Sequence, residues 1–315
     1  MFRHLFTLLY LLCSVAFFCR ADESDKLHIA SLHPLLGDMA RQIGGDRVVV
    51  IDLLKPNGNL HTFEPSPKDV AAAGKATLML ASGKNLEPYL TRLKEALGAS
   101  VTVLELGANV PDVAIAVDSA DTHHHHHHGG GSCSHCCHHG PNDPHWWHTP
   151  ANMKIAARTL TTKLIELLPA HQNQFRQSLF RWNRTMDQLS AWARTELNLI
   201  PTHKRILVTG HAAMNHFCKE FGFRSISVQG ISKEDEGHAA QLANILKKLR
   251  AAEVRAVFPE YSASPKSLEE IAKSLHIPLA EPLNTDGLSP SETDFATMFR
   301  KNVGIIRKAL SSSND

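Results

Sequence analysis

Residues 28–54 have the sequence HIASLHPLLGDMARQIGGDRVVVIDLL, in which two short apolar runs flank a helical pattern. We expect strands at 28–31 and 48–54, with a helix at 35–43 between them. Two strands joined by a helix predict a parallel pair, because parallel strands need a crossover connection of about a dozen residues or more.

The same alternation continues along the rest of the chain. In the first half we expect further strands at 77–81 and 101–106 and helices at 67–73 and 86–97. In the second half we expect strands at 205–209, 225–228, 256–259 and 279–282, and helices at 212–221, 239–252 and 267–275. This order predicts an α/β fold of two lobes, each a mostly parallel sheet flanked by helices.

The segment between the two halves is strongly helical, first at 150–168 and then from Pro169 to about Leu199. In the second helix, apolar residues recur at steps of three and four: Phe175, Leu179, Trp182, Met186, Leu189 and Ala193. Some thirty residues form a helix roughly 45 Å long, enough to join two lobes. We therefore expect an N-terminal lobe at 22–168, a linking helix at 169–200 and a C-terminal lobe at 201–315.

Residues 1–21 have the features of a secretory signal peptide: Arg3, an apolar run from Leu5 to Phe18, and small residues at a cleavage site ending in Ala21. An uncleaved membrane anchor and a lipid anchor are the alternatives. Cleavage would remove two of the 33 Lys and Arg residues and leave 31 against 31 Asp and Glu. A near-neutral exported protein in the periplasm is predicted, and no nucleic-acid partner is expected, because nucleic-acid binders need a basic face.

Histidine is the anomaly of the composition, with eleven of 21 residues between His123 and His148. They lie in a stretch at 107–149 without periodicity, and connections this long are usually functional or disordered. Imidazole and thiolate bind zinc, copper and nickel, so this stretch predicts an accessory metal loop. Its candidate ligands are His123, His124, His125, His126, His127, His128, Cys133, His135, Cys136, Cys137, His138 and His139. A disordered insertion and a purification tag are the alternatives, and some of the three cysteines would pair in an oxidising compartment.

Four other residues form a more specific candidate metal site: His61, His145, His211 and Asp286. Three of them follow predicted strands, and ligands of open α/β sheets bind at the carboxyl ends of strands. Two lobes that face each other would bring these side chains into one cleft. A single histidine at a strand end is more often hydrogen bonded than a ligand, so the prediction depends on the agreement among several positions.

The chain resembles the periplasmic metal-binding receptors of zinc and manganese ABC transporters, the zinc-uptake or TroA-like solute-binding proteins. The matching segments are HTFEPSP at 61–67, DPHWW at 143–147, TGHAAMNHF at 209–217, FPEYSASPK at 258–266 and PLNTD at 282–286. They occur in the family's order and cover essentially the whole mature chain. The resemblance implies two lobes joined by one long helix and a metal ion held between them by His61, His145, His211 and Asp286. It also implies a His-rich loop ahead of the second metal histidine and a membrane permease as partner.

The third ligand motif departs from the family, in which Phe/Ser-His-Asp is frequent where this chain has Gly210-His211-Ala212. We therefore expect the support of His211 to differ. Manganese-preferring relatives usually have a carboxylate at this position, so three imidazoles and one carboxylate favour Zn²⁺ over Mn²⁺ as the transported ion. Manganese or another divalent metal is the alternative. His148 and His216 rank below the four ligands, and Cys218 is expected to be a buried, inert thiol.

The predicted function is an extracytoplasmic receptor, acting as a monomer, that captures zinc and delivers it to an ABC permease. The competing class is a secreted zinc hydrolase, which needs an open coordination position and a general base. The sequence contains no His-Glu-x-x-His, Gly-x-Ser-x-Gly or phosphate-loop motif, so an enzyme is not expected. An exported zinc buffer or adhesin that works without a transporter is a third possibility.

Overall fold

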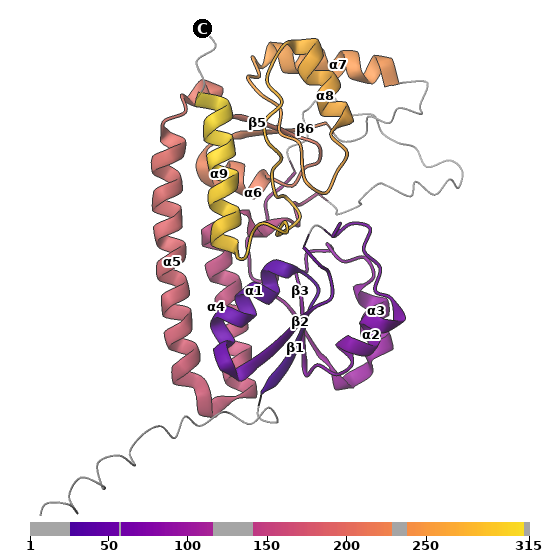
Figure 1. The fold of residues 1–315 in the computed structure, drawn as a ribbon, viewed down its shortest axis with the longest axis vertical. Helices are drawn as coiled ribbons and strands as arrows, with labels where there is room; N and C mark the ends of the chain where they lie inside the picture. Colours follow the sequence, from indigo (N-terminus) through magenta and orange to yellow (C-terminus); the bar gives the residue numbers. More distant parts are fainter. Residues whose placement is uncertain (1–25, 57, 116–140, 229–237, 312–315) are drawn as a thin grey trace, which may run out of the picture.

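The computed structural model describes residues 26–56, 58–115, 141–228 and 238–311. It consists of two α/β lobes with a layer of long helices along one side (Figure 1). The predicted fold class is confirmed. The predicted signal peptide and the accessory-loop ligands from His123 to His139 lie outside the described residues. Within the described ranges, no helix is long and apolar enough to cross a membrane.

The N-terminal lobe contains a four-stranded parallel sheet in the order β2-β1-β3-β4. Its strands are β1 (Leu27–Ser31), β2 (Val48–Asp52), β3 (Leu78–Ala81) and β4 (Thr102–Glu105). Its helices are α1 (Pro34–Gly44), α2 (Pro67–Ala73) and α3 (Leu90–Leu97). Alternate residues of the strands pack on opposite faces, so Ile29 lies in the cluster that contains α1, whereas Ala30 lies in the cluster that contains α2 and α3.

The C-terminal lobe contains a parallel pair, β5 (Ile206–Thr209) and β6 (Arg224–Ser227). Its helices are α6 (Asn215–Phe221), α7 (His238–Ala251), α8 (Lys266–Leu275) and α9 (Phe295–Ser311). The predicted strands at 256–259 and 279–282 are wrong, since these segments form only isolated parallel bridges. Pro259, Pro278 and Pro282 interrupt the ladder here because proline has no N–H to donate.

Two helix predictions also need correction, and one helix was missed. The helix predicted at 86–97 begins at Leu90, because Pro88 disfavours the helical conformation at Glu87. The helix predicted at 212–221 begins at Asn215, which leaves His211 on the preceding turn. Helix α9 was not predicted, although its buried residues recur at helical spacing: Phe295, Met298, Phe299, Asn302, Val303, Ile306 and Leu310.

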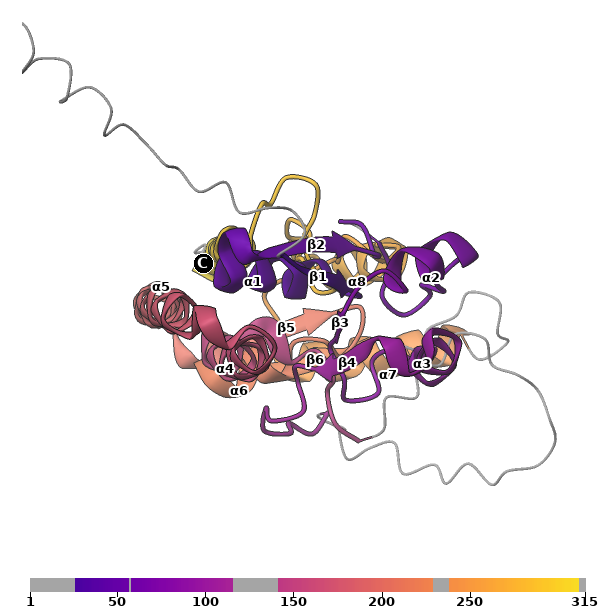
Figure 2. The same cartoon turned by 90° about the horizontal axis from the view of Figure 1, so that it is seen from below.

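Two long helices follow the first lobe, α4 (Pro150–Leu167) and α5 (Gln172–Asn198). They lie side by side, and α5 packs against α1 of the N-terminal lobe and against α9 of the C-terminal lobe (Figure 2). Its 27 residues give a length of about 40 Å. The apolar face predicted for it is buried, with Leu179 partly so. The lobe boundaries at 168 and 200 stay a prediction.

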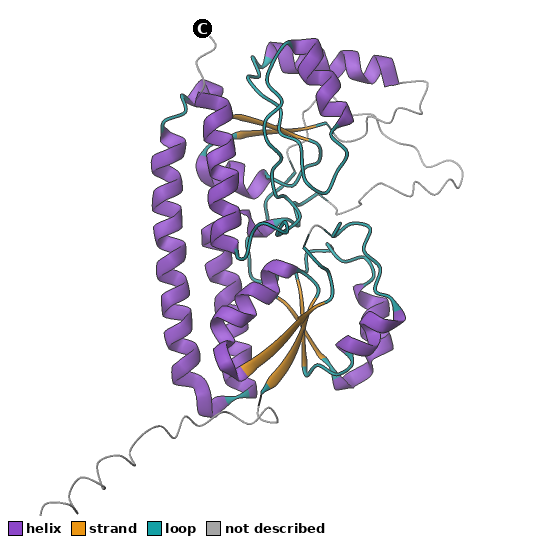
Figure 3. Cartoon of the chain, in the orientation of Figure 1, coloured by secondary structure: helices purple, strands orange, loops and turns teal. Residues whose placement is uncertain are grey.

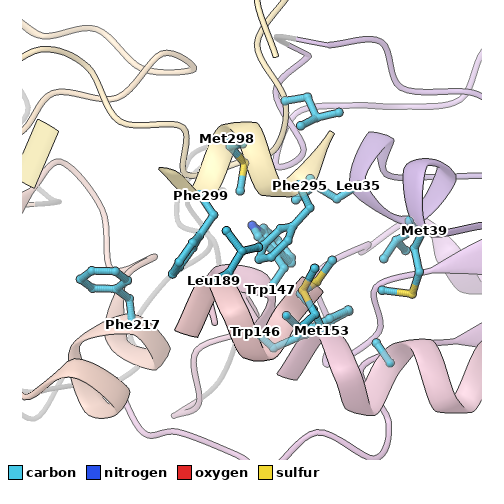
Figure 4. Packing of buried hydrophobic residues seen from close by; sticks show 14 of the residues in the cluster. Leu35, Met39, Trp146, Trp147, Met153, Leu189, Phe217, Phe295, Met298 and Phe299 are labelled. Atoms are coloured by element: carbon cyan, nitrogen blue, oxygen red, sulfur yellow. The ribbon is translucent and has the colours of Figure 1, made fainter. Parts of the chain in front are cut away.

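One hydrophobic cluster continues across both lobes. It includes residues of α1, α4, α5, α6 and α9 (Figure 4). The rings of Trp146 and Trp147 are fully buried in it, together with Leu189 of α5 and Phe295 of α9. Protein cores are densely packed, so the two lobes share one packed core. Loops fill the region between the two sheets (Figure 3).

Gly107 lies where the chain after β4 passes Trp146. An added Cβ there would clash with Trp146 Nε1 and with the Ser82 carbonyl oxygen, which are hydrogen bonded to each other at 3.2 Å. We expect Gly107→Ala to lower the free energy of unfolding of the metal-free protein by roughly 1–3 kcal/mol, measured by urea unfolding.

The matched control is Gly304→Ala in α9, where an added Cβ meets no described atom within 4 Å. Alanine is the better helix former, so this control is expected to raise the free energy of unfolding by about 0.5–1 kcal/mol. Equal effects of the two substitutions would contradict the tight packing of Trp146.

Candidate metal centre

The four predicted ligands meet where the two lobes face each other. His61 and His145 come from the first half of the chain, and His211 and Asp286 come from the second. One ligand atom from each residue lies within 4.8 Å of the other three. Among the described residues this is the only group of three or more histidine, cysteine or acidic side chains gathered in this way.

Local turns place each ligand. His61 lies on the loop after β2, where the Asn59 side-chain oxygen accepts the backbone N–H groups of His61 and Thr62, at 2.8 and 3.2 Å. His211 follows β5 by two residues, and the Thr209 hydroxyl donates to its carbonyl oxygen at 2.7 Å. Asp286 follows the bridge between residues 260 and 283, and His145 immediately precedes a short 3₁₀ turn.

Four of the six distances among the ligand atoms are close to those of a tetrahedral zinc site. His61 Nε2 lies 3.2 Å from His145 Nε2. Asp286 Oδ1 lies 3.5 Å from Nε2 of His61, 3.7 Å from Nε2 of His145 and 3.4 Å from Nε2 of His211. A tetrahedron with ligand distances of 2.0–2.1 Å has edges of about 3.3 Å. The other two distances, from His211 Nε2 to the remaining imidazoles, are within 4.8 Å.

The centre of this group contains unsatisfied polar atoms. His211 Nε2 and Asp286 Oδ1 are buried, and neither finds a hydrogen-bond partner among the described residues. Buried polar atoms without partners are rare because they cost free energy, and a cation between them would satisfy both. The His145 and Asp286 side chains are 2% and 5% exposed, whereas His61 and His211 are 10% and 14% exposed. Solvent therefore approaches the group on the side of His61 and His211.

The Asp143 carboxylate orients His145. Asp143 Oδ1 accepts from His145 Nδ1 at 2.7 Å and from its backbone N–H at 2.9 Å. The backbone and side-chain N–H groups of Asn215 donate to the other carboxylate oxygen, both at 3.0 Å. Because a carboxylate accepts, the proton of the neutral His145 ring is on Nδ1, and the lone pair of Nε2 faces the other three ligand atoms. Burial lowers the pKa of His145 despite Asp143, which favours this neutral form.

The Glu260 carboxylate supports His211 in the same way. Glu260 Oε2 lies 2.8 Å from His211 Nδ1, and Oε1 accepts the backbone N–H of His211 at 3.2 Å. A Cβ at Gly210 would lie 3.0 Å from Glu260 Oε2, so glycine lets the carboxylate approach. Burial opposes protonation of His211, but Glu260 and Asp286 outweigh it and raise its pKa well above the usual 6.5.

The supporting residues Asp143, Asn215, Glu260 and Ser262, whose hydroxyl donates to Asp286 Oδ2, were not predicted as part of the site. All four lie inside the motifs that carry the family resemblance. The signal for Asp143 is a carboxylate two residues before a candidate ligand, a spacing that permits a local hydrogen bond. Glu260 is 49 residues from His211, and only the fold brings them together.

His148 and His216, which were ranked below the four ligands, both lie outside the group of four. His148 Nε2 donates to the Thr285 carbonyl oxygen at 2.8 Å, and His216 Nε2 donates to the Asp143 carbonyl oxygen at 3.0 Å. Burial lowers the pKa of His148 to about 3, so its ring is neutral. Cys218 is buried as expected, and burial raises the pKa of its thiol to about 12.

Comparisons with known proteins agree on one family. The family profile described as "Zinc-uptake complex component A periplasmic" matches residues 29–309. The iron-binding protein YfeA of Yersinia pestis is 27% identical over 269 residues, which cover 85% of this chain and 80% of that relative. The manganese ABC transporter substrate-binding lipoprotein PsaA of Streptococcus pneumoniae is 26% identical over 293 residues, which cover 92% and 90%. The solved structure of the periplasmic zinc-binding protein TroA of Treponema pallidum has the same fold, with a TM-score of 0.76 at 22% identity over 91% of this chain and all of that one.

Proposed function

The chain belongs to the zinc-uptake family of periplasmic metal-binding proteins of ABC transporters, and we propose that its cargo is Zn²⁺. The protein acts outside the cytoplasm as a monomer, binds one ion between its lobes through His61, His145, His211 and Asp286, and delivers it to a membrane permease. The observation that supports this most is the gathering of three imidazole nitrogens and one carboxylate oxygen within 4.8 Å of one another.

The choice of metal depends on the donor atoms, because the names of the relatives include iron, manganese and zinc. Zinc prefers nitrogen-rich tetrahedral sites, whereas Mn²⁺ prefers oxygen ligands and a larger coordination number. Manganese is the second candidate, since several relatives are named as manganese-binding. Competition between the two ions for the mature protein tests the choice. We expect zinc to displace manganese from the site, and a preference for manganese would contradict the proposal.

Capture requires no chemistry on the ion. Asp143 and Glu260 hold protons on the Nδ1 atoms of His145 and His211, so the two Nε2 atoms are oriented toward the ion before it arrives. Four protein ligands would complete a tetrahedral shell and leave no position for the water molecule that a zinc hydrolase must activate. This arrangement supports a receptor rather than an enzyme.

Zinc affinity is expected to fall as the pH falls, because a proton and a zinc ion compete for the same nitrogen lone pair. Although burial opposes it, Glu260 and Asp286 raise the pKa of His211, so protons begin to compete for this ring at a higher pH than for an ordinary histidine. The loss is roughly tenfold per pH unit for each displaced proton. Chelator competition between pH 5 and pH 8 measures it, and equal affinities at both limits would contradict the three-histidine site.

We further propose that the His/Cys-rich segment captures zinc weakly and raises its concentration beside the cleft, a tethering effect that can reach millimolar levels. Deletion of 122–140 is expected to remove the additional zinc equivalents, to leave the cleft affinity unchanged and to reduce uptake when zinc is scarce. Stoichiometry by metal analysis and growth under zinc limitation measure these effects. Loss of the additional equivalents with unchanged uptake would contradict the delivery role.

A further inference from the structure

The segment that presents Asp286 comes from the C-terminal lobe, yet the chain at 145–148 fixes its position. Trp147 Nε1 donates to the Thr285 carbonyl oxygen at 3.1 Å, and His148 Nε2 donates to the same oxygen at 2.8 Å. A carbonyl oxygen has two lone pairs, so these two donors satisfy it completely. All three residues are at most 1% exposed. Two consecutive residues therefore hold the peptide immediately before the carboxylate ligand.

The same segment also lies against His33. The His33 ring packs on Trp147 at 4.5 Å between centroids, and a Cβ added at Gly287 would lie 3.4 and 3.5 Å from His33 ring atoms. Gly287 has φ of +129°, a conformation that residues with side chains rarely adopt. Residues 285–287 thus lie against both rings, with Thr285 hydrogen bonded to Trp147 and Gly287 packed beside His33.

These contacts of residues 285–287 set the position of the Asp286 carboxylate relative to the histidines of the other lobe. The two N-terminal ligands, His61 and His145, lie 3.5 and 3.7 Å from Asp286 Oδ1. Residues outside the ligand set commonly set metal affinity in this way, by holding a ligand in place before the ion binds.

We propose that His148 and Trp147 are positioning residues for metal binding and that they act through Asp286. The proposal rests on the proposed function, because it assumes that the group around Asp286 is the metal site. His148 donates through Nε2 as a neutral ring, and its loss would leave the Thr285 carbonyl oxygen with one donor and the Asp286 segment free to shift away from His61 and His145.

His148→Leu removes the N–H donor and puts an apolar side chain of similar bulk in its place. His148→Gln keeps an N–H group that can reach the Thr285 carbonyl oxygen. We expect His148→Leu to weaken zinc binding about tenfold or more and His148→Gln to restore most of the affinity. The stability control is Leu164→Ala, a cavity-forming change in the buried face of α4 near its C-terminal end. It is expected to destabilise the protein and leave zinc affinity unchanged.

The decisive test is a double-mutant cycle with Asp286→Ala. If His148 acts through Asp286, His148→Leu causes no further loss once the carboxylate is gone. Zinc affinity is measured on the full mature chain by chelator competition, with tryptophan fluorescence as the readout, because Trp147 lies 5.4 Å from the His145 ring, centroid to centroid. Gly287→Ala disturbs the contact of the same segment with His33. Its effect on zinc affinity is also expected to disappear when Asp286 is replaced by alanine. It keeps the test decisive if His148→Leu does not fold.

The outcomes separate this inference from the proposed function. An Asp286→Ala protein with unchanged zinc affinity would overturn the proposed site itself. A large loss in Asp286→Ala without loss in His148→Leu and Gly287→Ala would overturn only the positioning role. Equal losses from His148→Leu with and without Asp286 would also overturn it, because the effect would then reach the metal by another route.

Discussion

His211→Ala is expected to weaken zinc binding by more than about 100-fold, since changes to residues that merely orient a ligand already cost about 10–100-fold. The substitution removes one of four donors and leaves Asp286 Oδ1 without the imidazole nitrogen that lies 3.4 Å from it. It also leaves the buried Glu260 carboxylate without its partner at 2.8 Å. Chelator competition with the mature protein measures the loss.

His203→Ala is the matched control, because His203 is an exposed histidine of the same lobe that lies outside the group of four. It is expected to leave the affinity unchanged. If the two variants bind zinc equally well, the tight site does not include His211, and the proposed ligand set is wrong.

Asp143→Asn is expected to lower the free energy of unfolding of the metal-free protein by roughly 3 kcal/mol or more at pH 7. The Asp143 side chain is fully buried, and its two oxygens accept four N–H groups of His145 and Asn215. An asparagine has only one acceptor oxygen, so buried donors lose their partner. Since the same carboxylate orients His145, zinc affinity is expected to fall as well. Urea unfolding and chelator competition measure the two effects.

The pH dependence of this effect follows from the pKa of Asp143. Burial alone raises the pKa, but the hydrogen bonds from His145 and Asn215 outweigh burial and hold it well below the usual 3.8. A carboxyl group whose pKa is lower in the folded than in the unfolded state stabilises the folded state at pH values above its unfolded pKa. This stabilisation is lost as the pH falls toward the folded pKa. The difference in free energy of unfolding between wild type and Asp143→Asn is therefore expected to be full at pH 7 and to shrink below about pH 4.

Asp187→Asn serves as the control for the loss of a charge. Asp187 pairs with Lys154 at 2.6 Å, but its side chain is 65% exposed, and exposed ion pairs contribute about 1 kcal/mol or less. Similar destabilisation by both substitutions would contradict the role assigned to the Asp143 network.

The alternation of strands and helices predicted most of the fold because each element carries its own local pattern. The helix at 67–73, for example, begins at a Ser66 capping box with Pro67 at its first position. The errors lie where the local sequence pattern favours a strand but the segment does not pair along its length with a neighbouring strand. Residues 256–259 are apolar enough for a strand, yet they form only isolated bridges because prolines interrupt the hydrogen bonding here. That limit depends on which segments lie beside them in the fold.

The gathering of the four candidate ligands was predictable because three of them follow strand-like segments and because their motifs resemble one family. Its support was only partly predictable. The pairing of His211 with Glu260 depends on the bridge between Thr209 and Phe258, which places two segments distant in sequence side by side. The departure at Gly210 acquires a physical reason only in the structure, where Glu260 occupies the space that a side chain would need.

We propose that the tight metal site consists of His61, His145, His211 and Asp286. X-ray absorption at the zinc edge, on mature protein loaded with one equivalent of zinc, tests this ligand set. Four ligands are expected at about 2.0–2.1 Å, three imidazole nitrogens and one oxygen, with no sulfur. Sulfur scattering at about 2.3 Å would contradict this ligand set, because the ion would then be held by cysteines that the proposed site does not contain.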